Sequence, residues 1–192
     1  MSKATTESEI EAKLRPETAL EAKIIAHPDF RAGLFWGKPR FGHPEGAVIN
    51  HIPEVFANVD RLDIPEETRR KLRLITLVHD TFKHVEDKGS PRDWSKHHGV
   101  YARKFLAKFT DDPSLLTITE LHDEAYYCWR LIALYKRPEK GQERLNQLLE
   151  KLGDNLQLFY LFFKCDTQTG DKIQTPVKWF EQKVSGIEIV YF

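Results

Sequence analysis

The sequence has no excess of charge of either sign. Its 192 residues contain 29 Lys and Arg against 29 Asp and Glu, which gives a formal net charge of zero. A protein that binds the nucleic-acid backbone over many phosphates needs a clustered excess of positive charge. We therefore expect no extended nucleic-acid binding, although binding of a single nucleotide or of one nucleic-acid end stays open.

Cysteine and long apolar runs are also scarce. The two cysteines, Cys128 and Cys165, lie far apart, and we expect free thiols in the core of a protein from a reducing compartment. The strongest apolar run, residues 156–163, is interrupted by Gln157 and followed by Lys164, so it is far too short to span a bilayer. Because the N-terminal segment MSKATTESEIEAKLRPE is polar and mixed in charge, we expect no signal peptide and a cytoplasmic protein that does not enter membranes.

Strand-like alternation of apolar and polar residues is almost absent, and so are internal repeats and low-complexity tracts. Apolar residues make up 41% and charged residues 30% of the chain, as in ordinary soluble globular proteins. A chain of 192 residues can bury one substantial core but is too short to expect two. The sequence therefore predicts an all-α protein with a single domain over residues 1–192.

Helix signals divide the chain into segments. Two helices are predicted to open with a proline followed by an acid, at Pro44 and at Pro65. Residues 27–43 are predicted to form an ordered loop, and residues 86–93 a second loop in which Glu86 contributes a loop charge. The tail is expected to hold a short helix and then an extended segment. We expect the helices to cover residues 5–25, 44–62, 65–82, 94–109, 113–135, 142–152 and 154–168.

A polar residue recurs on the apolar stripe of each of five predicted helices. His51, for example, lies three residues after Val48 and four before Val55, so it should face the core. Such a side chain is costly to bury without a partner. Any one of them, taken alone, is most simply a core residue with a single hydrogen bond. The five residues are His51, His79, His97, His122 and Asp166.

Helices around one core turn their apolar stripes towards each other, so these five side chains should converge. Converging imidazoles and carboxylates satisfy one another poorly, whereas a divalent cation satisfies them together at about 2.0–2.2 Å per bond. Helical bundles commonly build metal sites from facing helices in this way. The sequence therefore predicts a metal site inside the bundle.

The adjacent pair His79 and Asp80 is a sharper signal. Neighbouring residues on a helix point about 100° apart, yet both can reach one ion where the backbone loosens at a helix end. Lys83 follows three residues after Asp80 on the same face, where it would be placed to hold an anionic substrate oxygen. The simpler alternative for Lys83 is a surface pair with Asp80, which would contribute little.

These residues carry a resemblance to a known family. The run LITLVHDTFKH resembles the signature helix of the HD superfamily, an apolar stretch followed by HDxxK. The preceding GHPEGAVINH resembles the start of the HD domain in some CCA-adding tRNA nucleotidyltransferases. The region of the family's third histidine resembles HHGVYARKF, and that of its fourth histidine resembles LHDEAYY. The region of the terminal aspartate resembles LFFKCDTQTGD. The match covers about residues 42–171, after a helical extension over 1–28 and before a short C-terminal extension. The sequence carries no nucleotidyltransferase domain, so that activity is not implied.

The resemblance implies a compact HD-domain helical bundle with one or two divalent ions per chain, of Mn, Fe, Ni, Co or Mg. Alignment on Ala102 favours His97 over His98 as the third histidine. In a site with two ions, Asp80 would join both. The implied ligands are His51, His79, Asp80 and Asp166 for the first ion, and Asp80, His97 and His122 for the second.

Ions of this kind lower the pKa of bound water and neutralise charge on a phosphoryl oxygen. We therefore expect a metal-dependent phosphohydrolase, either a phosphomonoesterase or a phosphodiesterase, for a nucleotide or related small phosphoester, with Asp80 and Lys83 as catalytic residues. Lys83, His43 and Arg40 are the expected substrate-binding residues, although a structural role for His43 and an exposed one for Arg40 stay open. The same ligands would suit an HD-fold di-iron oxygenase acting on a small polyol or phosphonate, or a non-catalytic metal-binding regulatory module. Assembly into a homo-oligomer also stays open.

Overall fold

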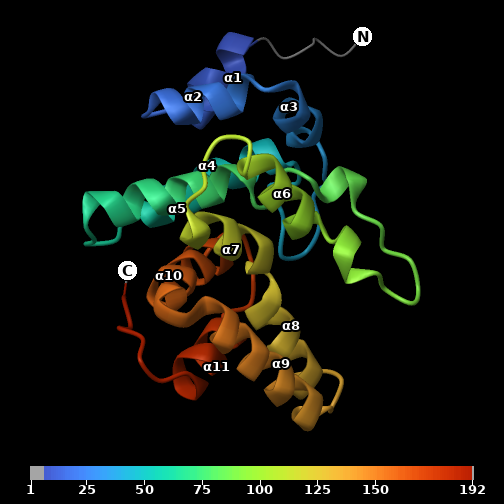
Figure 1. Ribbon diagram of the computed structural model, residues 1–192. Helices are drawn as coiled ribbons and strands as arrows, with labels where there is room; N and C mark the ends of the chain where they lie inside the picture. The colour runs from blue at the N-terminus through green and yellow to red at the C-terminus, as the bar shows by residue number, and fades with distance from the viewer. Residues whose placement is uncertain (1–6, 192) are drawn as a thin grey trace.

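The computed structural model describes residues 7–191, which form helices joined by loops and contain no strand, and this confirms the predicted all-α class (Figure 1). In the described part, extended pairing is limited to one bridge between Arg40 and His43. Turns of 3-10 helix lie at Lys83–Val85, Trp94–Lys96 and Gly153–Asn155. The α-helices are α1 (Glu7–Leu14), α2 (Ala19–Ala26), α3 (Pro28–Leu34), α4 (Val48–Val59), α5 (Glu66–Val78), α6 (His98–Leu106), α7 (Pro113–Leu121), α8 (Glu124–Ala133), α9 (Pro138–Leu152), α10 (Leu156–Thr167) and α11 (Thr175–Lys183).

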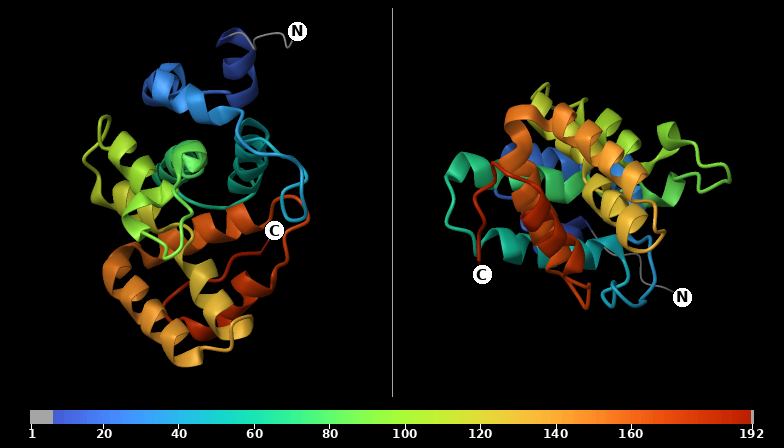
Figure 2. Two further views of the ribbon diagram at one scale, coloured as in Figure 1. Left: turned by 90° about the vertical axis from the view of Figure 1, so that its right-hand side faces the viewer. Right: turned by 90° about the horizontal axis from the view of Figure 1, so that it is seen from below.

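The helices are stacked around α10 (Figures 1 and 2). Helices α1 to α3 lie at one end of the molecule, α4 and α5 pack against each other next to them, and α8, α9 and α11 form the opposite end. Between these ends α10 packs against both α4 and α5. Its side chains Phe159, Tyr160 and Phe162 are completely buried. The core therefore joins the same helices that carry the predicted ligands.

The N-terminal segment forms two short helices, so the single helix predicted over residues 5–25 is wrong. Residues 5 and 6 lie outside the described part of the chain. The helix breaks because Arg15 has a φ of 46° and Pro16 cannot continue a helix. Helix α2 then starts after Thr18, whose side chain accepts a hydrogen bond from a backbone amide of the first turn.

This N-terminal extension is fixed to the core by a buried ion pair. The Arg73 guanidinium of α5 donates two hydrogen bonds to the Glu21 carboxylate of α2, at 2.9 and 3.0 Å. Arg73 also lies 4.0 Å from the centroid of the Phe56 ring. Because both charges are buried and paired, the extension is an integral part of the fold.

Four helix boundaries differ from prediction in ways that shape the site. The helix predicted over 65–82 ends at Val78, which leaves His79 and Asp80 beyond its last residue. The helix predicted over 113–135 is two helices, because the chain turns at His122 and Asp123. The helix predicted from residue 44 begins only at Val48, because Gly46 has a φ of 75° and a Cβ there would meet Pro39 at 2.8 Å. The helix predicted over 94–109 is a 3-10 turn followed by α6.

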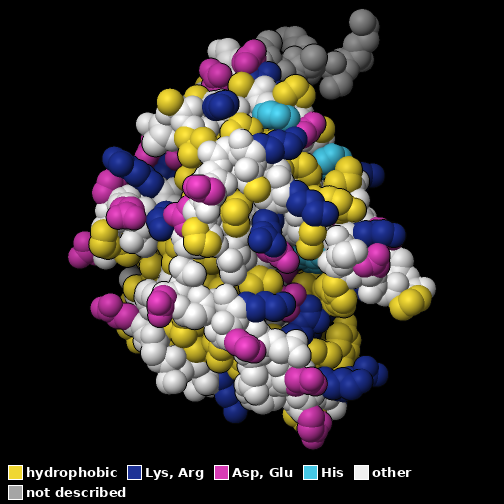
Figure 3. All heavy atoms as spheres, in the orientation of Figure 1, with side chains coloured by type: hydrophobic (Ala, Val, Ile, Leu, Met, Phe, Trp, Pro, Cys, Tyr) yellow, Lys and Arg dark blue, Asp and Glu magenta, His cyan; other side chains and the backbone are white. Residues whose placement is uncertain are grey.

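The other boundaries differ less. The predicted loop over residues 27–43 contains α3, whose start is capped by the His27 side chain, and α9 begins at Pro138 rather than at residue 142. The tail holds α11 and then a segment without helix, as predicted. In the described residues, no helix combines the length and apolar character needed to cross a bilayer. Basic and acidic side chains are interspersed on the face shown in Figure 3.

Candidate metal centre

Histidines and aspartates from five helices meet at one buried place. His51 comes from α4, His98 from α6, and Asp166 from α10. The other two helices, α5 and α7, contribute the residues that directly follow their last turns. The converging residues are His51, His79, Asp80, His98, His122, Asp123 and Asp166, and their four histidines are at most 3% exposed.

The first half of the cluster lies between α4, α5 and α10. His51 Nε2 lies 2.8 Å from Asp166 Oδ1. His79 Nε2 lies 3.8 Å from the same oxygen and 3.6 Å from Asp80 Oδ2. The ligand atoms of His51, His79 and Asp80 all lie within 4.8 Å of one another, so this group could hold a metal ion.

The second half lies between α6 and α7. His98 Nε2 is 3.1 Å from His122 Nε2, and these two nitrogens lie 3.3 and 3.5 Å from Asp80 Oδ1. Gly99 permits this approach, because a Cβ there would meet the Glu120 carbonyl oxygen at 2.4 Å. Asp80, His98 and His122 form a second group that could hold a metal ion.

Asp80 belongs to both groups, and its two oxygens face different halves. Its Oδ1 faces His98 and His122, while its Oδ2 faces His79 and the Lys83 ammonium, 2.5 Å away. Although burial favours the neutral acid, Lys83 and His79 hold the pKa of Asp80 well below its usual range. The carboxylate is therefore ionised and placed as a shared ligand.

His79 and His122 are oriented in the same way. Each directly follows the last residue of a helix, and each Nδ1 lies 2.8 Å from the carbonyl oxygen three residues earlier, that of Thr76 or Thr119. Because a carbonyl oxygen only accepts, Nδ1 carries a proton and donates, so each ring turns its Nε2 towards the cluster. Histidine ligands in metal sites are commonly fixed by such a contact.

The Nε2 atom of His79 is the clearest sign that the cluster is built for a cation. It is buried and has no hydrogen-bond partner among the described residues. Burial lowers the pKa of His79 to about 3, so the ring is neutral and its Nε2 is an acceptor. A buried acceptor without a partner is costly, whereas a divalent ion would satisfy it together with the neighbouring carboxylates. The residues present therefore fit a divalent metal ion.

His51 and His98 are backed by buried carboxylates instead. His51 Nδ1 lies 3.2 Å from Glu45 Oε1, and His98 Nδ1 lies 3.2 Å from Glu86 Oε1. Although burial opposes ionisation, contacts with His51 and with His98 lower the pKa of Glu45 and of Glu86, respectively, to about 2. A carboxylate behind a histidine fixes the ring and increases its basicity as a ligand.

The structure places His98, and not the predicted His97, beside Asp80 and His122. His97 directly precedes α6, where its Nδ1 accepts a hydrogen bond from the Gly99 amide and its Nε2 lies 3.2 Å from the Tyr127 hydroxyl. His98 is the first residue of α6 and lies four residues before the buried Ala102, on the same face. That spacing was visible in the sequence and should have favoured His98.

This assignment predicts different results for two neighbouring variants. We expect His98→Ala to lose metal from the second group, because it removes an inward-facing ligand atom. His97→Ala should keep its metal, because His97 belongs to neither group that contains Asp80. Elemental analysis of both purified variants checks this. Loss of metal from His97→Ala together with full retention in His98→Ala would contradict the placement of His98.

A cavity of about 360 Å³ opens onto the cluster. All three predicted substrate-binding residues line it, namely Arg40, His43 and Lys83. His43 Nδ1 also lies 3.0 Å from Glu45 Oε1, so His43 touches the carboxylate that backs His51. The cavity therefore brings the cationic side chains of Arg40 and Lys83 next to the candidate metal ligands.

Sequence reasoning missed four residues of this site: Glu45, Glu86, Asp123 and Lys172. Glu86 is not a solvated loop charge, because its side chain is 2% exposed and contacts His98. Lys172 Nζ lies 3.0 Å from Asp166 Oδ1. Asp123 Oδ2 lies 3.4 to 3.8 Å from three histidine nitrogens. For Asp123 the repeated His-Asp dipeptide at 122–123 was an available signal, whereas the other three lie in loops without periodicity.

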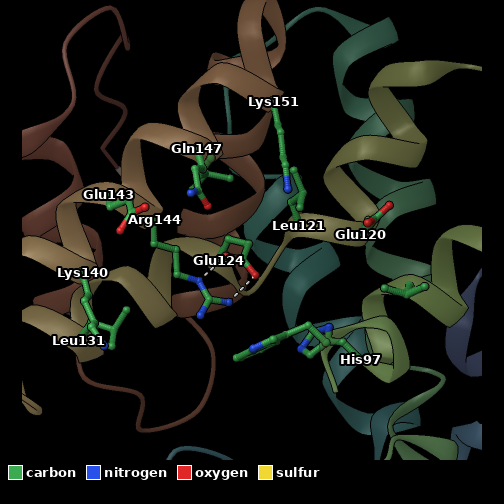
Figure 4. A pocket seen from close by; sticks show the side chains of 13 residues that line it. His97, Glu120, Leu121, Glu124, Leu131, Lys140, Glu143, Arg144, Gln147 and Lys151 are labelled. Atoms are coloured by element: carbon green, nitrogen blue, oxygen red, sulfur yellow. Dashed lines mark hydrogen bonds and ion pairs between the residues drawn. The ribbon is translucent and has the colours of Figure 1, made fainter. Parts of the chain in front are cut away.

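A second cavity, of about 410 Å³, has His97 among its lining residues (Figure 4). Arg144 of α9 projects into it and makes two hydrogen bonds, at 2.6 and 2.8 Å, to the Glu124 carboxylate. The Arg144 guanidinium also lies 4.3 Å from the centroid of the Trp94 ring. Arg144 and Glu124 therefore pair with each other and not with the residues of the metal cluster.

No protein-family model matches this chain, and neither the curated proteins nor the solved structures contain a significant match. Membership of the HD superfamily therefore remains a prediction from the sequence.

Proposed function

We propose that this protein is a metal-dependent phosphohydrolase that acts on the phosphate ester of a nucleotide or related small molecule. The observation that supports this most is the sharing of Asp80 between two groups of metal-ligand type, beneath a cavity that also contains two lysines. We further propose two divalent ions, one held by His51, His79, Asp80 and Asp166, the other by Asp80, His98 and His122. Mn, Fe, Ni, Co and Mg are the candidates.

The charges of the cavity favour an anionic substrate. Its lining includes three carboxylates, and the cations Arg40, Lys83 and Lys172 balance them. One or two divalent ions would therefore leave the loaded cavity strongly positive. A phosphoryl group is the anion that suits such a site, because its oxygens can contact the metal and the ammonium groups together.

The residues that line the cavity would have different roles in the reaction. Divalent ions, when bound, supply Lewis acidity towards a phosphoryl oxygen and lower the pKa of a coordinated water. Lys83 and Lys172 each lie against a candidate ligand carboxylate and also line the cavity, so they would hold the phosphoryl oxygens. His43 and Arg40 line the same cavity and would contact the more distant part of the substrate.

A phosphate-release assay tests this proposal. Supplied with Mn, Co, Ni or Mg, the protein should release inorganic phosphate from members of a phosphoester panel, and should do so equally well under nitrogen. The His79→Ala variant serves as the inactive control, because it lacks a central ligand. Substrate-dependent oxygen uptake with a mixed-valent di-iron spectrum, and no phosphate from any panel member, would contradict the proposal and favour oxygen chemistry.

A further inference from the structure

The cavity above the metal ligands has two kinds of wall. One wall is charged and belongs to the site already described. The remainder is almost wholly apolar and consists of Phe41, Tyr126, Phe163, Ile173 and Pro176. Thr167 and Tyr126 contribute the hydroxyl groups among the lining side chains. The cavity thus combines charged groups suited to an anion with a largely apolar surface that carries two hydroxyls.

Three of these apolar side chains are well exposed at the rim. Phe41 is 76% exposed, Ile173 46% and Tyr126 37%. Single exposed apolar residues are ordinary on a protein surface, but several around one cavity are typical of a ligand site. An occupant that covers them would gain the free energy of removing apolar surface from water.

The rim is held in place by contacts between its elements. Phe41 and Ile173 lie on two loops that run side by side (Figure 2). The Gly42 amide donates a hydrogen bond of 2.5 Å to the Asp171 carboxylate, which joins these loops next to both side chains. Tyr126, on α8, stacks on Trp129 with 5.8 Å between ring centroids. The apolar surfaces are therefore positioned before a ligand binds.

A hydroxylated substrate body has few partners on this wall of the cavity. Each sugar or polyol hydroxyl that leaves water needs a hydrogen-bond partner, and an unsatisfied one weakens binding. The largely apolar wall offers the hydroxyls of Thr167 and Tyr126 for this purpose. An aromatic ring has no such requirement on its faces and gains from contact with Phe41 and Tyr126.

We infer that the substrate is a phosphate ester with an aromatic body, which the cavity holds by the faces of its ring. This inference rests on the proposed function. It specifies phosphate esters that carry an aromatic ring in preference to sugar and polyol phosphates without one. Phe41, Tyr126 and Ile173 are the residues that would set this preference.

Binding of phosphonates tests the inference, because their carbon–phosphorus bond is not hydrolysed by a phosphoesterase. Metal-loaded protein is titrated calorimetrically under nitrogen with naphthylmethylphosphonate and with dihydroxypropylphosphonate. We expect the aromatic ligand to bind at least about 10-fold more tightly, as burial of one aromatic ring would allow. Phe41→Ala and Tyr126→Ala should each remove most of that preference without changing the affinity for dihydroxypropylphosphonate.

The matched control is Tyr135→Ala, which removes a tyrosine that is 52% exposed and lies outside the cavity lining. It should keep the wild-type preference. Equal affinities for the two ligands, tighter binding of the hydroxylated one, or an unchanged preference in both cavity variants would overturn the inference. Because the assay needs no turnover, a failure of phosphate release would contradict the proposed function separately and leave this comparison intact.

Discussion

Replacement of Asp80 by alanine should abolish metal binding to both halves of the cluster and reduce activity by more than ~100-fold. Asp80 is the ligand that both groups share, and its two oxygens face opposite halves. Changing an outer contact of a metal site typically costs about 10- to 100-fold in affinity or activity, and loss of a shared ligand should cost more. Elemental analysis and the phosphate-release assay measure the two effects.

The control for this variant is Asp87→Ala, which removes an exposed carboxylate close by in the sequence. It should keep wild-type metal content and activity. A helical circular-dichroism spectrum shows that Asp80→Ala is folded, and His79→Ala provides a second test if Asp80→Ala does not fold. Full metal occupancy in both Asp80→Ala and His79→Ala would show that the metal centre lies elsewhere.

Lys83→Ala should keep its metal but lose roughly 30- to 1000-fold in rate. Lys83 Nζ lies 2.5 Å from Asp80 Oδ2 and the side chain is 16% exposed, so its charge acts in a largely dry site. Loss of a charge-assisted contact to the transition state there should cost on the order of 2–4 kcal/mol. Lys83→Arg should recover only part of this, because guanidinium is larger and its donors point differently.

The matched control is Lys178→Ala, since Lys178 is exposed on α11 and does not line the cavity. Its activity should stay within about threefold of wild type, as for other surface charges. If Lys83→Ala also stays within that range, Lys83 is a partner of Asp80 alone and the case for an anionic substrate is weakened. The Lys172 amine lies against the Asp166 carboxylate in the same way, so we expect Lys172→Ala to behave like Lys83→Ala.

The inward-facing ligands could be predicted because helix periodicity determines them. His51 and Asp166 share the apolar stripes of their helices, and both lie in the cluster. The helix predicted over 65–82 ends at Val78 instead, and this earlier end lets His79 and Asp80 both face inward. His51 and Asp166 needed only the 3.6-residue period.

The parts that could not be predicted lie where the chain leaves regular helix. His122 faces the cluster as its place on the apolar stripe predicted, but helix propensity runs on through it, so nothing in the sequence marked the break that turns Asp123 inward as well. Glu45 contacts His51 from a turn that depends on the positive φ of Gly46, and Lys172 lies in a loop after α10. Contacts of this kind depend on tertiary packing and leave no periodic pattern in the sequence.

Anomalous X-ray scattering from crystals of the protein tests most directly whether the shared cluster binds divalent metal at Asp80. Protein purified without chelator and supplied with Mn should give anomalous peaks between Asp80 and its two groups of histidines. One peak should lie beside His51 and His79, and the other beside His98 and His122. Absence of any peak beside Asp80 at full Mn supply, with peaks elsewhere or none, would contradict the account.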